Sequence, residues 1–219
     1  MARRAAQIKL TAIEQDAPMH ARIYDELRRA LMGGAMQPGQ VLSYRSLAEA
    51  LGTSPMPVRD AVRRLITERA LEARPNRTIA VPQLTAERVA EIYKIRISLE
   101  GLAAEEAAAH VTDRDVAELK ALEAEMEAAQ QAGAVRKYVD ANWRFHFKIY
   151  RLSGLDQLIE LIESLWLQIG PMINNQLAPF DHHNAAIKAL EARDGAAARA
   201  AIAADLGESR ETMLGKMAG

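Results

Sequence analysis

The sequence contains no cysteine, few aromatic residues and no long apolar run. The absence of cysteine excludes disulfide bonds, thiolate catalysis and cysteine-ligated zinc. No stretch approaches the ~20 consecutive apolar residues that span a bilayer. The first residues, "MARRAAQIKLTAIEQD", carry two arginines but lack the apolar segment of a secretory signal, so we expect a cytoplasmic protein without a membrane partner.

The chain has 219 residues, enough for one large domain or two modest ones with a real core. Its net charge of −1 is unevenly distributed, because residues 1–82 carry +5 and residues 83–219 carry −6. A basic amino-terminal part joined to an acidic carboxy-terminal part favours a polyanion-binding module attached to something else.

Residues 18–82 have the pattern of a small helical module that ends in a β-hairpin. An apolar stripe at helical spacing ends at two glycines, and a "QPG" turn separates it from a short helix that Ser43 can cap. A third helix begins after Ser54, with two prolines in the first turn, where they are tolerated. Strands over residues 71–74 and 78–81 flank a "PNR" turn.

This order of elements is that of a winged helix-turn-helix, in which two helices hold a third against the major groove of DNA. The third helix carries Arg59, Arg63 and Arg64 on its polar sides, and the "PNR" turn places Asn76 and Arg77 at the tip of the wing. Arginines so placed can contact base edges or phosphates. The alternative is a small domain whose arginines only form a solvated face.

The segment from Ile23 to Val81 resembles the DNA-binding domain of GntR-family transcription regulators, through "QPG", "SYRSLA" and "LGTSPMPVRDAV" at fixed spacings. The resemblance implies binding to double-stranded operator DNA. It also implies that bases are contacted by Arg45, Ser54 and Arg59. By the same resemblance, the DNA backbone or minor groove is contacted by Arg63, Arg64, Asn76 and Arg77.

Two positions depart from that family pattern. Pro55 stands where an arginine commonly contacts DNA, and a proline has no backbone N–H to donate to a phosphate. Thr78 replaces the glycine of the wing, and threonine does not adopt a positive φ cheaply. We therefore expect a non-standard operator sequence.

After Pro82 the chain changes to long alanine- and glutamate-rich helices separated by short breakers. They are predicted over residues 85–110, 113–132, 134–152, 155–176, 180–193 and 195–214. The predicted fold class is therefore mainly α. It comprises a flexible arm over residues 1–17, a winged helix-turn-helix over 18–82, and an antiparallel helical bundle over 83–219 for effector binding and dimerisation.

Several polar residues fall on the core-facing stripes of these helices, namely Arg96, Asn142, His146, His183 and Asp205. A buried guanidinium is costly unless it meets a carboxylate. Arg96 therefore either pairs with a bundle acid such as Glu100 or clamps the carboxylate of a ligand. A lone histidine on such a stripe is more often a hydrogen-bonded core residue, but a shared metal or polar ligand would satisfy several such groups together.

The motifs "YKIRISLE", "NWRFH" and "HNAAIKALEARD" resemble the FCD domain of the FadR subfamily of GntR regulators. The resemblance implies a divalent metal (zinc, nickel or manganese) held by Asn142, His146, His183 and Asp205. It further implies a small carboxylate effector bound by Arg96 with the first three of these residues. Asp205 replaces a histidine of the family pattern, and Asn142 stands where strong metal binders often have aspartate. Two imidazoles and a carboxylate still form a legitimate divalent site, but a cavity that binds its effector without metal is the alternative.

The predicted function is a ligand-responsive transcription factor, a repressor as is most common in that family, and not an enzyme. It would bind a pseudo-palindromic operator as a homodimer, and the effector would shift the relative placement of the two DNA-binding modules. Two other interpretations stay open. One is a metal-dependent, hydrolase-like domain fused to the DNA-binding module, and the other is a helical protein-interaction domain.

Overall fold

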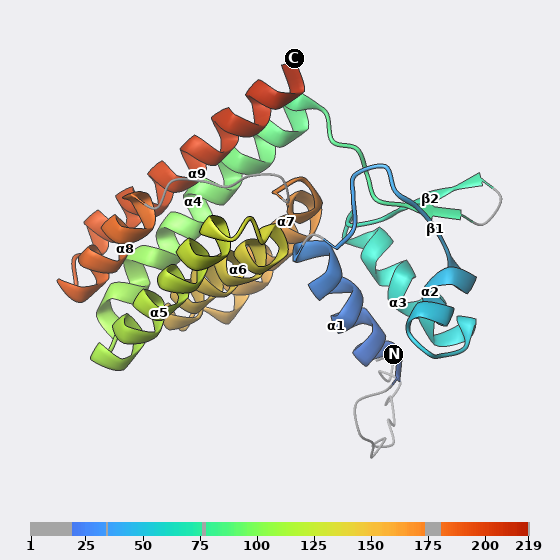
Figure 1. The fold of residues 1–219 in the computed structure, drawn as a ribbon, viewed down its shortest axis with the longest axis horizontal. Coiled ribbons are helices and arrows are strands. Elements are labelled where there is room, and N and C mark those ends of the chain that lie inside the picture. Colours follow the sequence, from blue (N-terminus) through green and yellow to red (C-terminus); the bar gives the residue numbers. More distant parts are fainter. Residues whose placement is uncertain (1–18, 34, 76–77, 174–180, 219) are drawn as a thin grey trace, which may run out of the picture.

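The computed structural model describes residues 19–33, 35–75, 78–173 and 181–218. Within them, a small amino-terminal module with a three-stranded sheet is followed by a bundle of long helices (Figure 1). This confirms the mainly α fold class with a winged helix-turn-helix before the bundle. The predicted arm over residues 1–17 lies outside the described residues.

The amino-terminal module consists of α1 (Met19–Met32), β1 (Val41–Ser43), α2 (Tyr44–Ala50), α3 (Pro55–Thr67), β2 (Glu72–Arg74) and β3 (Thr78–Ala80). β3 is the central strand, antiparallel to both neighbours, and Ile79 faces Leu42 on one side and Ala73 on the other. β1 was not predicted, because three residues between a turn and a helix are too few to show the alternation of a strand.

The starts of α2 and α3 follow the sequence signals. Ser43 caps α2 through a reciprocal capping box with Ser46. Pro55 is the first residue of α3, where its missing N–H costs nothing, and Ser54 is the N-cap. The side chain of Ser54 makes no capping hydrogen bond.

The bundle consists of α4 (Ala86–His110), α5 (Asp113–Gln131), α6 (Val135–Leu152), α7 (Asp156–Ile173), α8 (Asp181–Glu191) and α9 (Gly195–Ala218). The predicted bounds were close, and the largest difference is at α9, which continues to Ala218. α9 runs along α4 (Figure 1), and the small residues of both helices allow a close approach. A Cβ atom at Gly195 would lie only 2.8 Å from the Glu105 carbonyl oxygen.

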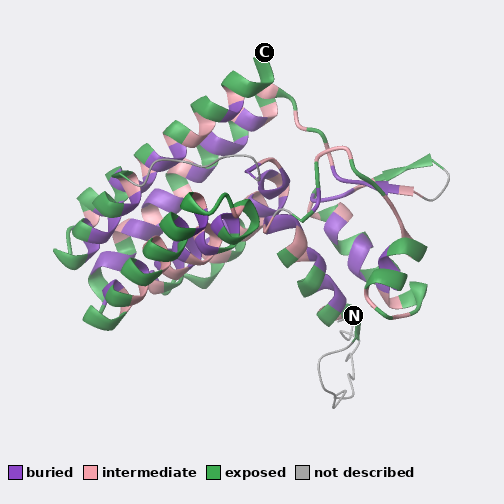
Figure 2. Ribbon diagram, in the orientation of Figure 1, coloured by how far each residue is buried: buried purple, intermediate pink, exposed green. Residues whose placement is uncertain are grey.

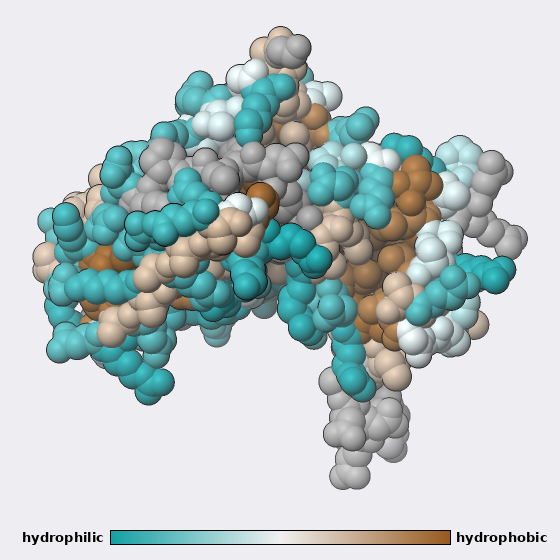
Figure 3. All heavy atoms as spheres, in the orientation of Figure 1, coloured by the Kyte–Doolittle hydropathy of each residue, from teal (hydrophilic) through white to brown (hydrophobic). Residues whose placement is uncertain are grey.

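Burial follows the inward sides of the helices in both parts (Figure 2), and hydrophilic residues cover much of the visible face of the bundle (Figure 3). Among the described residues, no helix has both the length and the apolar character that crossing a bilayer requires.

The two parts meet where α7 packs on the carboxy-terminal end of α1. A Cβ atom at Gly170 would lie 2.9 Å from both the Leu31 carbonyl oxygen and the Met32 Cα atom, so only glycine permits this approach. An ion pair between Arg28 of α1 and Glu163 of α7 lies at the same junction. The amino-terminal module is therefore fitted directly against one helix of the bundle.

We expect Gly170→Ala to lower the free energy of unfolding by about 1–3 kcal/mol, because the new methyl group must push two backbones apart. Gly207→Ala is the matched control, since a Cβ there meets nothing within 4 Å. That change should raise stability by up to about 1 kcal/mol through helix propensity. Urea unfolding of both variants checks this, and equal effects at the two positions would contradict the close approach of α7 to α1.

Candidate functional site

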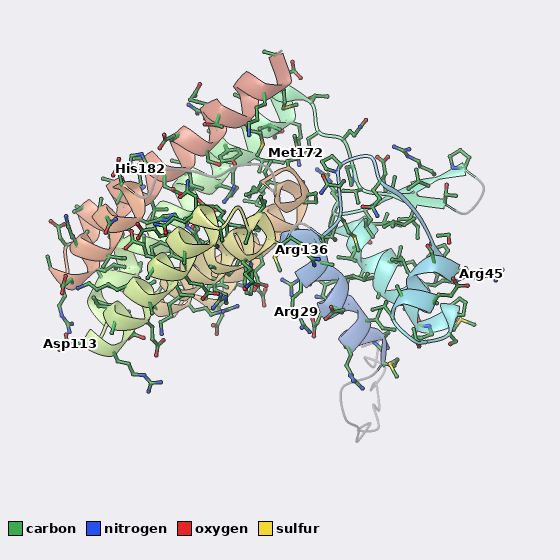
Figure 4. The ribbon with its side chains drawn as sticks, in the orientation of Figure 1. Arg29, Arg45, Asp113, Arg136, Met172 and His182 are labelled. Carbon is green, nitrogen blue, oxygen red and sulfur yellow. The ribbon has the colours of Figure 1, made fainter. Side chains whose placement is uncertain are left out.

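The first candidate site is the exposed arginine-bearing face of α2 and α3. The Arg45 side chain is 87% exposed and lies at the end of the module remote from the bundle (Figure 4). Its Nε donates to Glu49 at 2.8 Å, and Arg63 lies 3.7 Å from Asp60. Such exposed pairs are weak and screened by salt, so a phosphate can replace either carboxylate.

Arg59 is held by a residue that sequence reasoning missed. Its guanidinium carbon lies 5.4 Å from the centre of the Tyr44 ring, at the start of α2, which is within cation–π range. The contact joins two helices, so no spacing within either helix indicates it. Tyr44 thus restrains the arginine that the sequence places closest to DNA bases.

Arg64 has its partners on another side of α3. Its guanidinium carbon lies 3.8 Å from the centre of the Tyr24 ring of α1, and its Nε donates to Glu68 at 3.1 Å. The Tyr24 hydroxyl also donates to Glu68, at 2.6 and 2.7 Å. These groups border a cleft of about 550 Å³ between the module and α7. The structure therefore places Arg64 at the junction of the two parts, away from Arg59, and its role on DNA stays a prediction.

Of the other predicted DNA-contacting residues, Ser54 is exposed at the N-cap of α3. Asn76 and Arg77 lie outside the described residues, so their role also stays a prediction.

The second candidate site is a buried polar cluster between α4, α6, α8 and α9. Each member is at most 8% exposed. They are Arg96, Glu100, His146, Tyr150, His183 and Asp205. A polar group that is buried must find partners inside the protein, so the contacts within this cluster decide what it can bind.

Arg96 and Glu100 form an ion pair one turn apart on α4. Arg96 Nε donates to Glu100 Oε1 at 2.6 Å, and Nη2 donates to Oε2 at 3.3 Å. Burial disfavours the charge of Arg96, but the carboxylate of Glu100 outweighs it and raises the arginine's pKa. The internal ion pair that the sequence left open is therefore present.

The ion pair does not use every donor of Arg96. Within the described residues, Nη1 is buried without a hydrogen-bond partner, and so is Nε1 of Trp166. The Arg96 guanidinium carbon lies 4.5 Å from the centre of the Trp166 ring. Arg96 of the cluster and the adjacent Trp166 of α7 thus have one spare donor each, and a ligand oxygen can accept a hydrogen bond from such donors.

Hydrogen bonds fix the tautomer of His146. The Tyr150 hydroxyl donates its single proton to Glu100 Oε2 and lies 3.0 Å from His146 Nδ1. Because that proton is already committed, Nδ1 must be the donor to the tyrosine oxygen. In a neutral imidazole this leaves the lone pair on Nε2, which is the atom that faces Asp205. Sequence reasoning missed Tyr150.

Three of the four predicted metal ligands come together around Asp205. His146 Nε2 lies 3.4 Å from Oδ2, and His183 Nε2 lies 3.4 Å from Oδ1. One ligand atom from each residue lies within 4.8 Å of the others, which suits coordination distances of about 2.0–2.2 Å. Asn142 is half-buried one turn before His146 on α6, and its membership of the set stays a prediction.

Burial controls the protonation of these groups. It lowers the pKa of His183 to about 4 and that of His146 well below its usual range, with neighbouring positive charge adding to the effect. Burial also raises the pKa of Asp205 to about 7. The imidazoles are therefore neutral at pH 7, so their contacts with Asp205 are not ion pairs. A divalent metal requires neutral imidazoles and an ionised carboxylate, so its binding would displace the proton that Asp205 holds in part near pH 7.

We expect Glu100→Gln to lower the free energy of unfolding by about 3–5 kcal/mol, because it leaves the buried Arg96 charge without a carboxylate. Tyr150→Phe removes one hydrogen-bonding hydroxyl and should cost about 1–3 kcal/mol. Glu105→Gln, at the exposed Arg199 pair, is the control and should cost at most about 1 kcal/mol. Chemical denaturation ranks the three, and a loss at Glu100 no larger than at Glu105 would show that the buried pair is unimportant.

Comparisons with known proteins agree with this division of the chain. Residues 19–81 match the family described as "Bacterial regulatory proteins, gntR family", and residues 91–208 match the FCD domain. The HTH-type transcriptional regulator McbR of Escherichia coli K12 is 36% identical over 149 residues, covering 68% of this chain and 67% of McbR. The solved structure of E. coli McbR/YncC is similar over 93% of this chain and 100% of its own, with a TM-score of 0.85 and 29% identity.

Two further relatives carry related names. The HTH-type transcriptional regulator YdhC of Bacillus subtilis is 30% identical over 155 residues, covering 69% of this chain and 68% of YdhC. The HTH-type transcriptional repressor RspR of E. coli K12 is 24% identical over 213 residues, covering 93% and 92%. All three relatives are named as transcriptional regulators, which supports a regulator and not an enzyme. The chain therefore belongs to the gntR family of bacterial regulatory proteins, as a DNA-binding transcriptional regulator with an FCD domain.

Proposed function

We propose that this regulator is a repressor that binds a pseudo-palindromic operator as a homodimer and is controlled by a small carboxylate effector in the bundle. A divalent metal held by His146, His183 and Asp205 would anchor the effector. The observation that carries the proposal is the buried set of two neutral imidazoles and one carboxyl group, with ligand atoms within 4.8 Å of one another.

Operator binding is assigned to the exposed face of the amino-terminal module, with the domain boundary between residues 82 and 83. Arg45, Ser54 and Arg59 would contact bases, and Arg63 would contact phosphate. Two recognition helices related by a two-fold axis contact two half-sites, which is the reason for a homodimer. The similarity to RspR, which is named a repressor, supports that sign of regulation.

The tautomer of His146 favours a metal. Its Nε2 lone pair faces Asp205, so an ionised Asp205 would place a lone pair opposite a carboxylate at 3.4 Å with nothing positive between them. A divalent cation between the two removes that repulsion. The hydrogen bond from Nδ1 to Tyr150 would orient the ring, as partners of metal-bound histidines commonly do.

The effector is assigned to the side of the cluster next to Arg96. A carboxylate there could accept from Arg96 Nη1 and Trp166 Nε1, the donors without partners. The positive charge of Arg96 is close enough to lower the pKa of both His146 and Asp205. An anion bound at that point would therefore lie near the metal ligands.

A second candidate is effector binding without metal, and one observation favours it. A protonated Asp205 could itself donate to His146 Nε2, and burial raises the pKa of Asp205 to about 7, so this form is accessible near neutral pH. The charge of Asp205 would then be neutralised by a proton, and no metal ion would be needed between Asp205 and His146.

We expect Arg59→Ala to weaken operator binding by about 5- to 150-fold at moderate salt, the loss of about 1–3 kcal/mol expected for a base-contacting arginine. Arg29→Ala is the matched control, since Arg29 is an exposed arginine of the same module on α1. That change should alter the affinity less than about 2-fold. Titration of the protein on its own promoter measures both. Equal affinities for Arg59→Ala and wild type would show that α3 is not the recognition helix.

We expect protein purified without chelator to hold roughly one divalent ion per chain, measured by elemental analysis. His183→Ala should lose the ion, whereas His110→Ala should keep it, because His110 is exposed at the end of α4. Tyr150→Phe should weaken the metal affinity by about 10- to 100-fold, because it frees the His146 ring. A wild-type protein that holds no ion, and whose Tm does not rise with zinc, nickel or manganese, would leave only the metal-free candidate.

A further inference from the structure

We infer that Met56 is a base-contacting, specificity-determining residue whose side chain packs on the 5-methyl group of a thymine in the operator. This adds an apolar contact to the arginine contacts assigned above. It rests on the proposed placement of α3 as the recognition helix.

The first observation is exposure. Met56 is 70% exposed, more than any other large hydrophobic residue among those the structure describes. The apolar face of the same helix is complete without it, because Val58, Val62 and Leu65 are fully buried. Met56 therefore contributes little to the core of the module.

The second observation is its position on α3. Met56 is in the first turn of the helix, and the first turn is the part of a recognition helix that contacts base edges. Residues three and seven positions further on lie on the same side of a helix, and here they are the exposed Arg59 and Arg63. Met56 thus shares its face with the arginines assigned to DNA.

The third observation is the chemistry of that turn. Pro55 and Pro57 flank Met56, and neither has an N–H to donate to a phosphate. Two of the first three residues of the helix therefore lack the N–H group with which helix amino termini usually bind anions. The thymine methyl is the apolar group that the major groove offers to such a surface. The unbranched, polarizable side chain of methionine adapts well to a small apolar partner.

The experiment removes that methyl group alone. Binding sites are selected from random duplex DNA with the full-length protein, and each thymine of the selected site is then replaced in turn by deoxyuridine. We expect one position per half-site at which deoxyuridine weakens wild-type binding by about 3- to 10-fold. Met56→Ala should bind the thymine and deoxyuridine duplexes equally, whereas Met56→Leu should keep a preference for thymine.

Two controls separate this inference from the proposed function. Met19→Ala removes another exposed methionine, on α1, and should keep the thymine preference. Arg59→Ala should weaken binding to both duplexes but keep their ratio. Thermal unfolding monitored by circular dichroism establishes that each variant is folded.

The inference is overturned if no thymine position distinguishes the two bases, or if Met56→Ala keeps the preference. Should Arg59→Ala still weaken binding in that case, the recognition helix stands and only the role of Met56 is lost. If Arg59→Ala also binds like wild type, the assignment of α3 fails, and the role of Met56 fails with it.

Discussion

The ion pair between Arg96 and Glu100 is the constraint on which the buried cluster depends. Neither charge can be buried without the other, so Glu100 must stay ionised and accept hydrogen bonds. It takes the proton of the Tyr150 hydroxyl, which obliges His146 to donate through Nδ1. The Nε2 lone pair is then directed at Asp205. A charge on α4 thus sets the protonation pattern of a histidine on α6, which is the property that makes the cluster suitable for a cation.

One helix touches both this cluster and the DNA-binding module. On one side α7 carries Trp166, which lies against the Arg96 guanidinium and 5.7 Å from the His146 ring. On another side, α7 carries Glu163 and Gly170. Glu163 is paired with Arg28 of α1, and Gly170 packs against the backbone of α1. A ligand that displaced Trp166 would have to move a helix whose Gly170 has no free space against the backbone of α1. The proposed effector site and the amino-terminal module are therefore joined by contiguous packing through α7.

The sequence predicted the helices well because their breakers and apolar stripes are local signals. It also predicted that His146, His183 and Asp205 would be buried, since each lies on such a stripe. It could not choose between an internal partner and a ligand for Arg96, because both satisfy a buried guanidinium equally. Contacts between elements had no local signal at all. Tyr44 with Arg59, Tyr24 with Arg64, and Tyr150 with Glu100 are examples, and β1 was too short to be seen.

The family pattern that the sequence resembles has a histidine where this chain has Asp205. This difference changes the free energy of the cluster when no metal is bound. Three histidines can all be neutral when no metal is bound, so such a site can stay empty with little penalty. A buried carboxylate is costly without a metal, because burial raises the pKa of Asp205 although His182 and Arg96 both favour its charged form. Asp205 must either take up a proton, as its raised pKa near 7 indicates, or share its charge with a cation. The substitution therefore ties the occupancy of the site to the protonation of one carboxyl group, since a bound metal and a bound proton exclude each other there.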